Sequence, residues 1–142
     1  MDRKFGRKKA NREHMMRNLV TSLILYERVT TTEPKAKELK REIDRVITIA
    51  KKDDLFSYRQ ILGYVFDVNA AKKLKEVLVP RYQSRTSGYS KFFHNGQRLG
   101  DAAPMAIVEL IAEETKEVKK PADQTAKKEP AKAAKVSAKS NL

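Results

Sequence analysis

The strongest constraint on the fold is a periodic run of apolar residues that follows Pro34. Proline suits the first turn of a helix, and Thr32 or Glu33 can cap that turn. Apolar residues then recur at helical spacing, at Ala36, Leu39, Ile43, Val46, Ile47 and Ala50. A helix with so broad an apolar stripe must be covered by other elements, so the core is expected to form around it.

Two further helices and one strand are predicted around this segment. A first helix is expected to begin at Asn11, a good N-cap residue, and to bury Met16, Leu19, Val20 and Leu23. The β-branched run at residues 28–32 predicts a strand. After the central helix, Asp53 or Asp54 can cap another, with an inner face of Leu55, Tyr58, Leu62, Val65 and Phe66.

The second half of the chain predicts one more helix and two strands. Asn69 is expected to cap a helix that ends near Pro80 and turns inward Ala70, Leu74, Val77 and Leu78. Residues 84–88 are polar and indicate a loop, and residues 89–94 alternate as a strand does. Asn95-Gly96 indicates a turn, and the nearly all-apolar residues 104–111 indicate the central strand.

The order helix, strand, three helices, two strands predicts an α+β fold, a two-layer α/β sandwich with a small three-stranded sheet. Residues 1–10 are expected to be a flexible, unstructured basic arm that binds RNA, and residues 11–112 a single domain. Residues 113–142 consist mostly of Lys, Ala, Glu, Pro and Ser without an aromatic residue. Because such a segment cannot bury enough apolar surface to offset its ordering entropy, we expect a disordered extension.

The sequence offers little support for an enzyme, a metal site or a cofactor site. The chain has no Cys and only two His, and no zinc-protease, nucleophile-elbow or phosphate-loop motif occurs. Asp53-Asp54 is better explained as a helix cap than as a catalytic pair. Apolar stretches are far shorter than the roughly 20 residues of a membrane span. The N-terminus lacks the apolar region of a secretory signal.

Charge points to a polyanionic partner. The formal net charge is +13, and residues 1–17 hold seven basic and two acidic side chains. Each basic side chain of an arm can reach a phosphate and release counterions, and arginine can also stack on unpaired bases. This first group comprises Arg3, Lys4, Arg7, Lys8, Lys9 and Arg12. The alternative is that such a cluster only keeps the protein soluble.

A second group mixes basic and aromatic residues, and no acidic residue occurs between Glu76 and Asp101. Its members are Arg81, Tyr82, Arg85, Tyr89, Lys91 and Arg98. Exposed rings among basic residues are typical of sites for single-stranded or irregular RNA. Alternatively, both tyrosines pack in the core with their hydroxyls at its rim. Lys35 and Lys37 can contact nucleic acid or belong to a solvated helix face.

Several segments together resemble one family. They are Arg3-Lys-Phe-Gly-Arg7 leading into His14-Met-Met-Arg-Asn-Leu19, Thr31 to Lys40, Ile47 to Lys51, Pro80-Arg-Tyr82 with Arg85 and Ser87-Gly-Tyr89, and Arg98-Leu-Gly-Asp-Ala-Ala-Pro-Met-Ala-Ile-Val-Glu-Leu110. In order and without a long gap, they are similar to the bacterial large-subunit ribosomal protein seventeen family. Two features depart from its pattern: Phe93-His94-Asn95 replaces a usually aliphatic and basic stretch, and most members end soon after the last strand.

The resemblance implies a non-enzymatic structural constituent of the large (50S) ribosomal subunit in the cytoplasm. It implies binding and stabilisation of 23S rRNA on the exit-tunnel side, near large-subunit proteins twenty-two and thirty-two. The protein would be a monomer within the ribosome. By this resemblance, the family's RNA-facing start is matched by Arg3, Lys4, Gly6, Arg7, Arg12, Arg17 and Asn18. Its helix entry is matched by Lys35 and Lys37, and its basic loop by Arg81, Arg85, Gly88, Tyr89 and Arg98.

Two other classes remain as alternatives. A nucleoid-type DNA-binding protein would suit the charge equally well, but neither a helix-turn-helix spacing nor a long basic helix is evident. A membrane-surface anchor would need bulky apolar residues opposite its basic face, and the arm has only Phe5.

Overall fold

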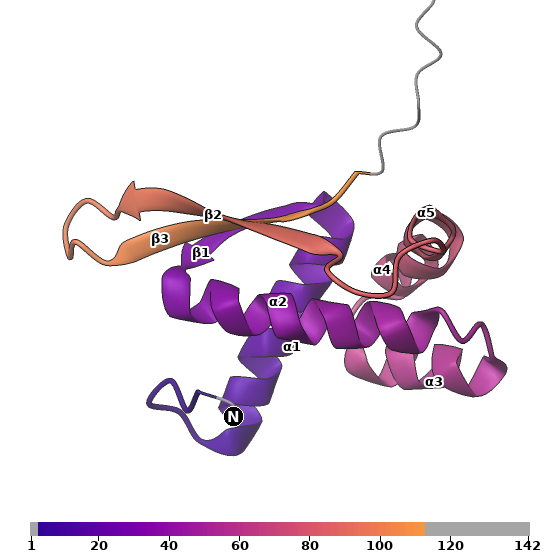
Figure 1. Ribbon diagram of the computed structural model, residues 1–142. Helices are drawn as coiled ribbons and strands as arrows, with labels where there is room; N and C mark the ends of the chain where they lie inside the picture. Colours follow the sequence, from indigo (N-terminus) through magenta and orange to yellow (C-terminus); the bar gives the residue numbers. More distant parts are fainter. Residues whose placement is uncertain (1–2, 113–142) are drawn as a thin grey trace, which may run out of the picture.

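The computed structural model describes residues 3–112. Its elements are α1 (Lys9–Tyr26), β1 (Arg28–Thr32), α2 (Glu33–Ala50), α3 (Leu55–Tyr64), α4 (Val68–Lys73), β2 (Ser90–Gln97) and β3 (Pro104–Leu110). A π-helical stretch, η1 (Leu74–Leu78), and the short α5 (Val79–Arg81) continue α4. Figure 1 shows the sheet as one layer and the helices as the other. The predicted α+β class, element order and two-layer arrangement are confirmed. The predicted extension at 113–142 lies outside the described residues.

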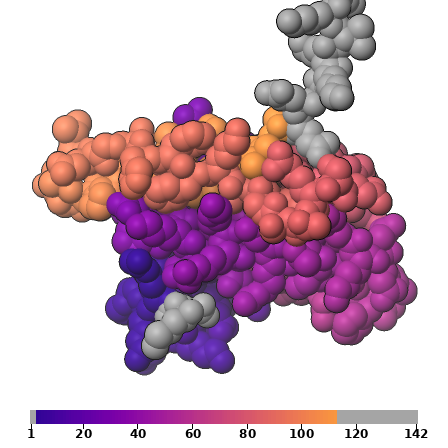
Figure 2. Space-filling view, in the orientation of Figure 1, coloured from indigo at the N-terminus to yellow at the C-terminus, as the bar shows by residue number. Residues whose placement is uncertain are grey.

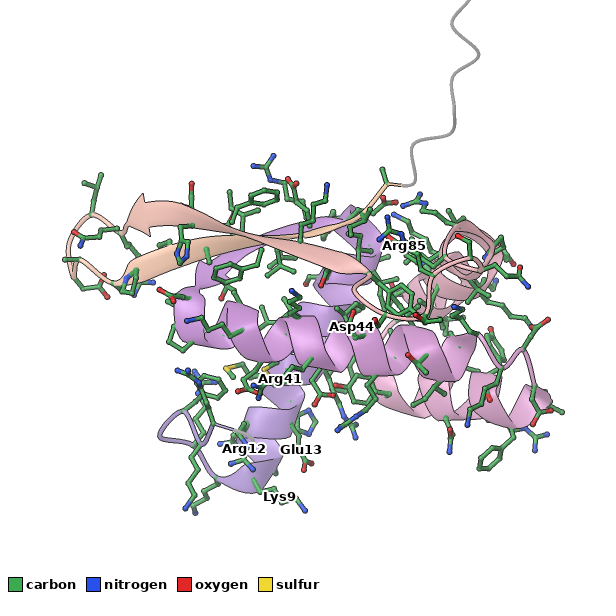
Figure 3. The ribbon with its side chains drawn as sticks, in the orientation of Figure 1. Lys9, Arg12, Glu13, Arg41, Asp44 and Arg85 are labelled. Carbon is green, nitrogen blue, oxygen red and sulfur yellow. The ribbon has the colours of Figure 1, made fainter. Side chains whose placement is uncertain are left out.

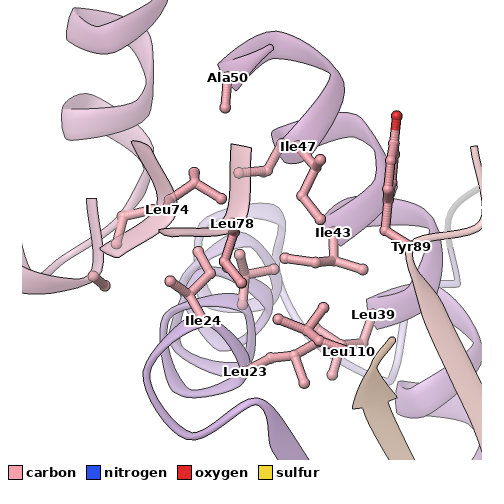
Figure 4. Packing of buried hydrophobic residues seen from close by; sticks show 14 of the residues in the cluster. Leu23, Ile24, Leu39, Ile43, Ile47, Ala50, Leu74, Leu78, Tyr89 and Leu110 are labelled. Carbon is pink, nitrogen blue, oxygen red and sulfur yellow. The ribbon is translucent and has the colours of Figure 1, made fainter. Parts of the chain in front are cut away.

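Helix α2 is the centre of the core, as its apolar stripe predicts. All the residues of that stripe are buried, and Thr32 is the N-cap residue before Pro34. Figure 4 shows Ile43 and Ile47 facing side chains of α1, η1 and β3, among them Ile24, Leu78 and Leu110. The sheet, α1 and the later helices therefore all depend on one helix for their packing.

The three strands form an antiparallel sheet in the order β1-β3-β2. Strand β3 is central, as its apolar sequence predicts. Ala106, Val108 and Leu110 are buried and alternate with half-buried Ile107 and Glu109. One face of the sheet therefore packs on the helices, and the opposite face meets solvent, as is common for antiparallel sheets.

The prediction of a turn at Asn95-Gly96 is wrong. Both residues lie within β2, where the pairing with β3 shifts register between His94 and Gln97. Gly96 has φ +69°, a conformation that glycine adopts readily. The glycine therefore marks a β-bulge within β2 and not a reversal of the chain. The chain reverses at residues 98–103, and the hairpin extends past the helices (Figures 1 and 2).

The start of the chain forms a turn followed by a helix. Helix α1 begins at Lys9 instead of Asn11, and Lys8 is its N-cap residue, with a backbone carbonyl that accepts the Arg12 N–H at 3.0 Å. Before it, Phe5 and Gly6 adopt positive φ angles in a turn. Phe5 is partly buried and packs against the core.

The inner face predicted for α3 is wrong for Leu55, Leu62 and Phe66, which are exposed. Val65 is buried as predicted, and Ser57 and Ile61 are buried as well, because α2 and α4 contact a neighbouring stripe of the helix. In the next helix the cap is Asp67, which accepts the Asn69 N–H at 2.9 Å, and not Asn69. Val77 is exposed although Leu74 and Leu78 are buried, because the backbone there is π-helical and changes the face that each residue occupies.

Replacement of Ile43 by alanine tests the central role of α2. Ile43 is fully buried, so Ile43→Ala is expected to lower the free energy of unfolding by about 2–5 kcal/mol through lost burial and a new cavity. Urea unfolding followed by circular dichroism measures this change. Lys40→Ala on the exposed face of the same helix is the control, with an expected change within about 0.5 kcal/mol. Equal effects of the two variants would contradict this description of the core.

Candidate nucleic-acid interface

The fold places the carboxylate of Glu27 against two basic side chains. Arg81 Nη1 lies 2.7 Å from Glu27 Oε2, and Arg81 Nη2 donates to Glu27 Oε1 at 3.5 Å. Lys73 Nζ lies 2.8 Å from the same carboxylate. The charge of Arg81 is therefore compensated inside the protein by a carboxylate 54 positions away in the sequence.

Glu27 is held in place by the backbone around it. It follows α1 with φ +59°, and its N–H donates to the Leu23 carbonyl, whereas its own carbonyl accepts the Leu110 N–H at 2.9 Å. The hydrogen bond from Arg81 lowers the pKa of Glu27, and partial burial opposes that change. Glu27 thus connects the end of α1 and the end of β3 with α4 and α5.

Arg98 is paired in the same way at the tip of the β2–β3 hairpin. Its Nε and Nη2 donate to the two carboxylate oxygens of Asp101 at 2.9 and 2.6 Å. This hydrogen-bonded pair lowers the pKa of Asp101 to about 2. The prediction that the second group stands without acids is therefore wrong for Arg81 and Arg98, because the fold brings in Glu27 and the turn brings in Asp101.

Tyr82 and Tyr89 are 0% and 1% exposed, so their rings cannot serve as platforms for bases. The rings meet at a centroid distance of 5.3 Å, and Tyr82 Oη donates to the Ile111 carbonyl at 2.7 Å. Tyr89 Oη donates to the Thr86 carbonyl at 3.0 Å. The alternative, that both tyrosines pack in the core, is confirmed. The selection of Tyr89 as a stacking residue is corrected accordingly.

Arg85 and Lys91 are the exposed basic residues of the second group that form no ion pair within residues 3–112. Lys51 donates to the Arg85 carbonyl and so fixes the loop backbone without neutralising the guanidinium. Figure 3 shows Arg85 on the sheet side of α2, whereas Lys9 and Arg12 lie at the start of α1. The structure does not bring the two predicted groups together.

The first group keeps most of its charge uncompensated. In the described part of the chain, Lys4, Arg7, Lys8 and Arg12 have no carboxylate within ion-pair distance. Arg3 Nε lies 3.8 Å from the buried Glu38, and Lys9 Nζ lies 3.9 Å from Glu13, both longer than hydrogen bonds. The first turn of α1 holds no acidic residue either. Positive charge therefore concentrates at this end of the molecule.

Lys35 and Lys37, at the start of α2, differ in whether an ion pair compensates their charge. Lys37 Nζ lies 2.5 Å from Glu33, one helical turn earlier. Lys35 is half-buried and makes no ion pair with any residue that the structure describes. Lys35 is thus the more available of the two predicted contacts at the start of α2.

One face of α1 carries polar residues that surround an open hollow of about 520 Å³. It is lined by Arg7, Asn11, His14, Met15, Asn18 and Leu19. Of these, only Arg7 and Asn18 were selected from the sequence. The spacing Arg7, Asn11, His14, Asn18 follows one side of a helix, and this is the signal that would have identified Asn11 and His14.

Arg17 lies beside two aromatic rings, neither of which was among the predicted site residues. Its guanidinium carbon is 5.3 Å from the Tyr64 ring centroid and 5.9 Å from that of Phe66. Tyr64 Oη donates to Glu42 Oε2 at 3.3 Å. Burial of the phenol and, to a lesser degree, the negative charge of Glu42 raise the pKa of Tyr64 to about 12. At neutral pH Tyr64 therefore donates to Glu42 as an uncharged phenol, and its ring face contacts the Arg17 guanidinium.

Neither a cluster of metal ligands nor a membrane-spanning helix occurs in residues 3–112. No group of three His, Asp or Glu side chains there could hold a metal ion. Within the same range, no helix combines the length and apolar character that crossing a bilayer requires.

The described part of the chain is thus a small α+β fold with unpaired basic side chains at one end. Comparison with known proteins is more specific. The family model for "Ribosomal protein L17" matches residues 15–111. The chain belongs to this family, which consists of structural ribosomal proteins and not of enzymes.

Similar relatives are described as large ribosomal subunit protein bL17. The protein of Syntrophotalea carbinolica is 46% identical over 125 residues, which are 87% of this chain and 81% of that protein. That of Caldanaerobacter subterraneus is 46% identical over 109 residues, covering 77% and 97% of the two chains. That of Desulforudis audaxviator is 47% identical, with the same coverage.

The pH dependence of stability of a Glu27 variant tests the ion pair that compensates the charge of Arg81. Because the folded pKa of Glu27 is below its ordinary 4.5, the pair stabilises the fold above about pH 4.5, and this stabilisation is lost as the pH falls through the folded value. Glu27→Gln is expected to lower the free energy of unfolding by about 1 kcal/mol at neutral pH and by progressively less in acid. Urea unfolding at several pH values measures the difference.

Glu76→Gln is the matched control, because Glu76 is exposed and makes no ion pair in the described chain. Its effect is expected to be small at every pH. A Glu27→Gln effect that stays constant from neutral pH into acid would show that Glu27 acts through packing instead of charge.

Proposed function

We propose that the chain binds 23S rRNA, chiefly through the basic side chains at the start of α1, as a structural protein of the large ribosomal subunit in the cytoplasm. Family membership supports the structural role in the large subunit. One observation carries the assignment of the contact surface. In the described chain, no carboxylate pairs with Lys4, Arg7, Lys8 or Arg12. Arg81 and Arg98, by contrast, each form an ion pair with a carboxylate.

The start of α1 also has the geometry of an anion-binding end. The first N–H groups of a helix have no intrahelical acceptor, and the helix dipole makes this end positive. The side chain of Lys8 does not cap them, and the first turn carries no carboxylate. RNA phosphates can therefore meet backbone donors together with the guanidinium groups of Arg7 and Arg12.

A second, weaker contact is proposed for Arg85, Lys91 and Lys35. Their charges are also uncompensated among the described residues, and Figure 3 shows Arg85 apart from Lys9 and Arg12 of the first group. Arg81, Lys37 and Arg98 would have to exchange a carboxylate for a phosphate, so they are expected to contribute less. Arg3 and Lys9, with their long ion pairs, and Arg17 and Asn18 on α1 complete the proposed surface.

The resemblance to the family supports the finer placement. We propose that the protein lies, as a single copy, on the exit-tunnel side beside large-subunit proteins twenty-two and thirty-two. The basic end of α1 would then face RNA, which leaves the solvent-facing side of the sheet for other neighbours.

Removal of four charges at the start of α1 tests the proposal. A variant with Lys4, Arg7, Lys8 and Arg12 changed to Gln is expected to bind 23S rRNA fragments at least about tenfold more weakly at moderate salt. Because four phosphate contacts are lost, the slope of log affinity against log salt should decrease by about 3. Filter binding over a range of salt concentrations measures both quantities. Point changes are preferable to truncation, because residues 5–12 include a core contact and the start of α1.

The matched control removes the same net charge elsewhere, by changing Lys40, Lys52, Arg59 and Lys72 to Gln. These side chains are exposed and unpaired in the part of the chain that the structure describes. A small change is expected. If both variants lost affinity equally, net charge alone would drive binding and the proposed surface would be wrong.

Competition between structured 23S rRNA and duplex DNA of equal length separates the proposal from the nucleoid alternative. Ribosomal RNA is expected to displace the bound probe at lower concentration. Preference for duplex DNA would contradict ribosomal RNA binding.

A further inference from the structure

Two aromatic rings are stacked on the surface beside the basic end of the molecule. His14 of α1 and Phe66, two residues after the end of α3, have ring centroids 5.4 Å apart and planes inclined by only 6°. Phe66 is 49% exposed, and His14 is exposed as well. A stacked pair uses one face of each ring, so aromatic surface remains open to solvent.

The stack is fixed by its surroundings. Buried Val65 precedes Phe66, and the Phe66 N–H points to Thr21 Oγ1 at 3.5 Å. The Arg17 guanidinium carbon lies 5.9 Å from the Phe66 ring centroid and places a positive charge against that ring. A platform held in this way would lose little conformational entropy when a ligand stacks on it.

The stack continues into the open hollow beside α1, because His14 belongs to both. Asn11 and Asn18 in that hollow carry amides that can donate to and accept from the edge of a base. Arg7 lines the same hollow and offers a guanidinium to a phosphate. An open aromatic surface, amide groups and cations therefore occur together within one patch.

We infer that the His14–Phe66 stack binds an unpaired base of RNA, with Arg17 and Arg7 positioned for the flanking phosphates. The inference rests on the proposed RNA binding and specifies which RNA feature this surface contacts. Every base has an aromatic face that can stack on such rings, but within a duplex those faces are covered by neighbouring pairs. The positive charge around the stack favours a nucleotide over an apolar protein segment.

A fluorescent reporter tests the stacking directly, because the chain has no Trp. Phe66→Trp in the full chain introduces a single indole at the stack. Its emission is expected to be quenched by an RNA hairpin with an unpaired loop and much less by a blunt duplex of the same length. Phe56→Trp is the matched control, at a phenylalanine on α3 that is 64% exposed. Equal quenching at the two positions, or no quenching at position 66, would overturn the inference.

Affinity gives an independent measurement. Phe66→Ala is expected to weaken binding of the looped hairpin by about 5- to 100-fold, the loss typical of one stacked base. The same change should leave duplex affinity within about twofold of the unsubstituted chain. Phe56→Ala is expected to change neither affinity. Thermal unfolding of each variant establishes that it is folded, and exposed His14→Ala provides a second removal of the stack without touching the core.

The outcomes separate this inference from the proposed function. If Phe66→Ala and His14→Ala bind the looped hairpin as tightly as the unsubstituted chain, the stack is not a base-binding site. The RNA contact at the start of α1 can still hold in that case. If the unsubstituted chain binds neither RNA, the proposed function itself fails. Retained RNA binding with quenching of Phe66→Trp only by a ribosomal protein would instead assign the stack to a protein partner.

Discussion

Burial of the α2 stripe is the interaction on which the rest of the structure depends. Ile43 and Ile47 pack among side chains from α1, η1 and β3, so these elements acquire fixed positions only by covering one helix. The small three-stranded sheet would be marginal by itself, and α2 supplies the apolar partner that it needs. With the core fixed, Phe5 can pack against it and orient the basic start of the chain.

The same packing decides which charges face outward. Glu27 terminates α1 in a left-handed conformation and thereby reaches Arg81 and Lys73, and Asp101 neutralises Arg98 within its own turn. The excess of positive charge is therefore not spread evenly over the surface. In the described chain it is least compensated where α1 begins, and the proposed RNA contact follows from that distribution.

Local patterns predicted most of the fold. The α2 stripe, the strand at Arg28–Thr32 and the central strand β3 depend on periodicity and composition, which the sequence displays directly. Non-local effects account for the errors. The Glu27–Arg81 pair joins residues 54 positions apart. The π-helical stretch turns Val77 outward, and Gly96 lies in a β-bulge instead of a turn. Burial of Tyr82 and Tyr89, and the stacking of His14 on Phe66, likewise depend on contacts between distant segments.

The central claim is that the end of the molecule around α1 faces ribosomal RNA. Because the chain has no Cys, a single cysteine at Asn11 or Glu76 can carry a tethered iron chelate into reconstituted large subunits. Both positions are exposed, Asn11 on the polar face of α1 and Glu76 in η1. The account predicts strong hydroxyl-radical cleavage of 23S rRNA from position 11 and weak cleavage from position 76. Stronger cleavage from position 76, or none from position 11, would contradict it.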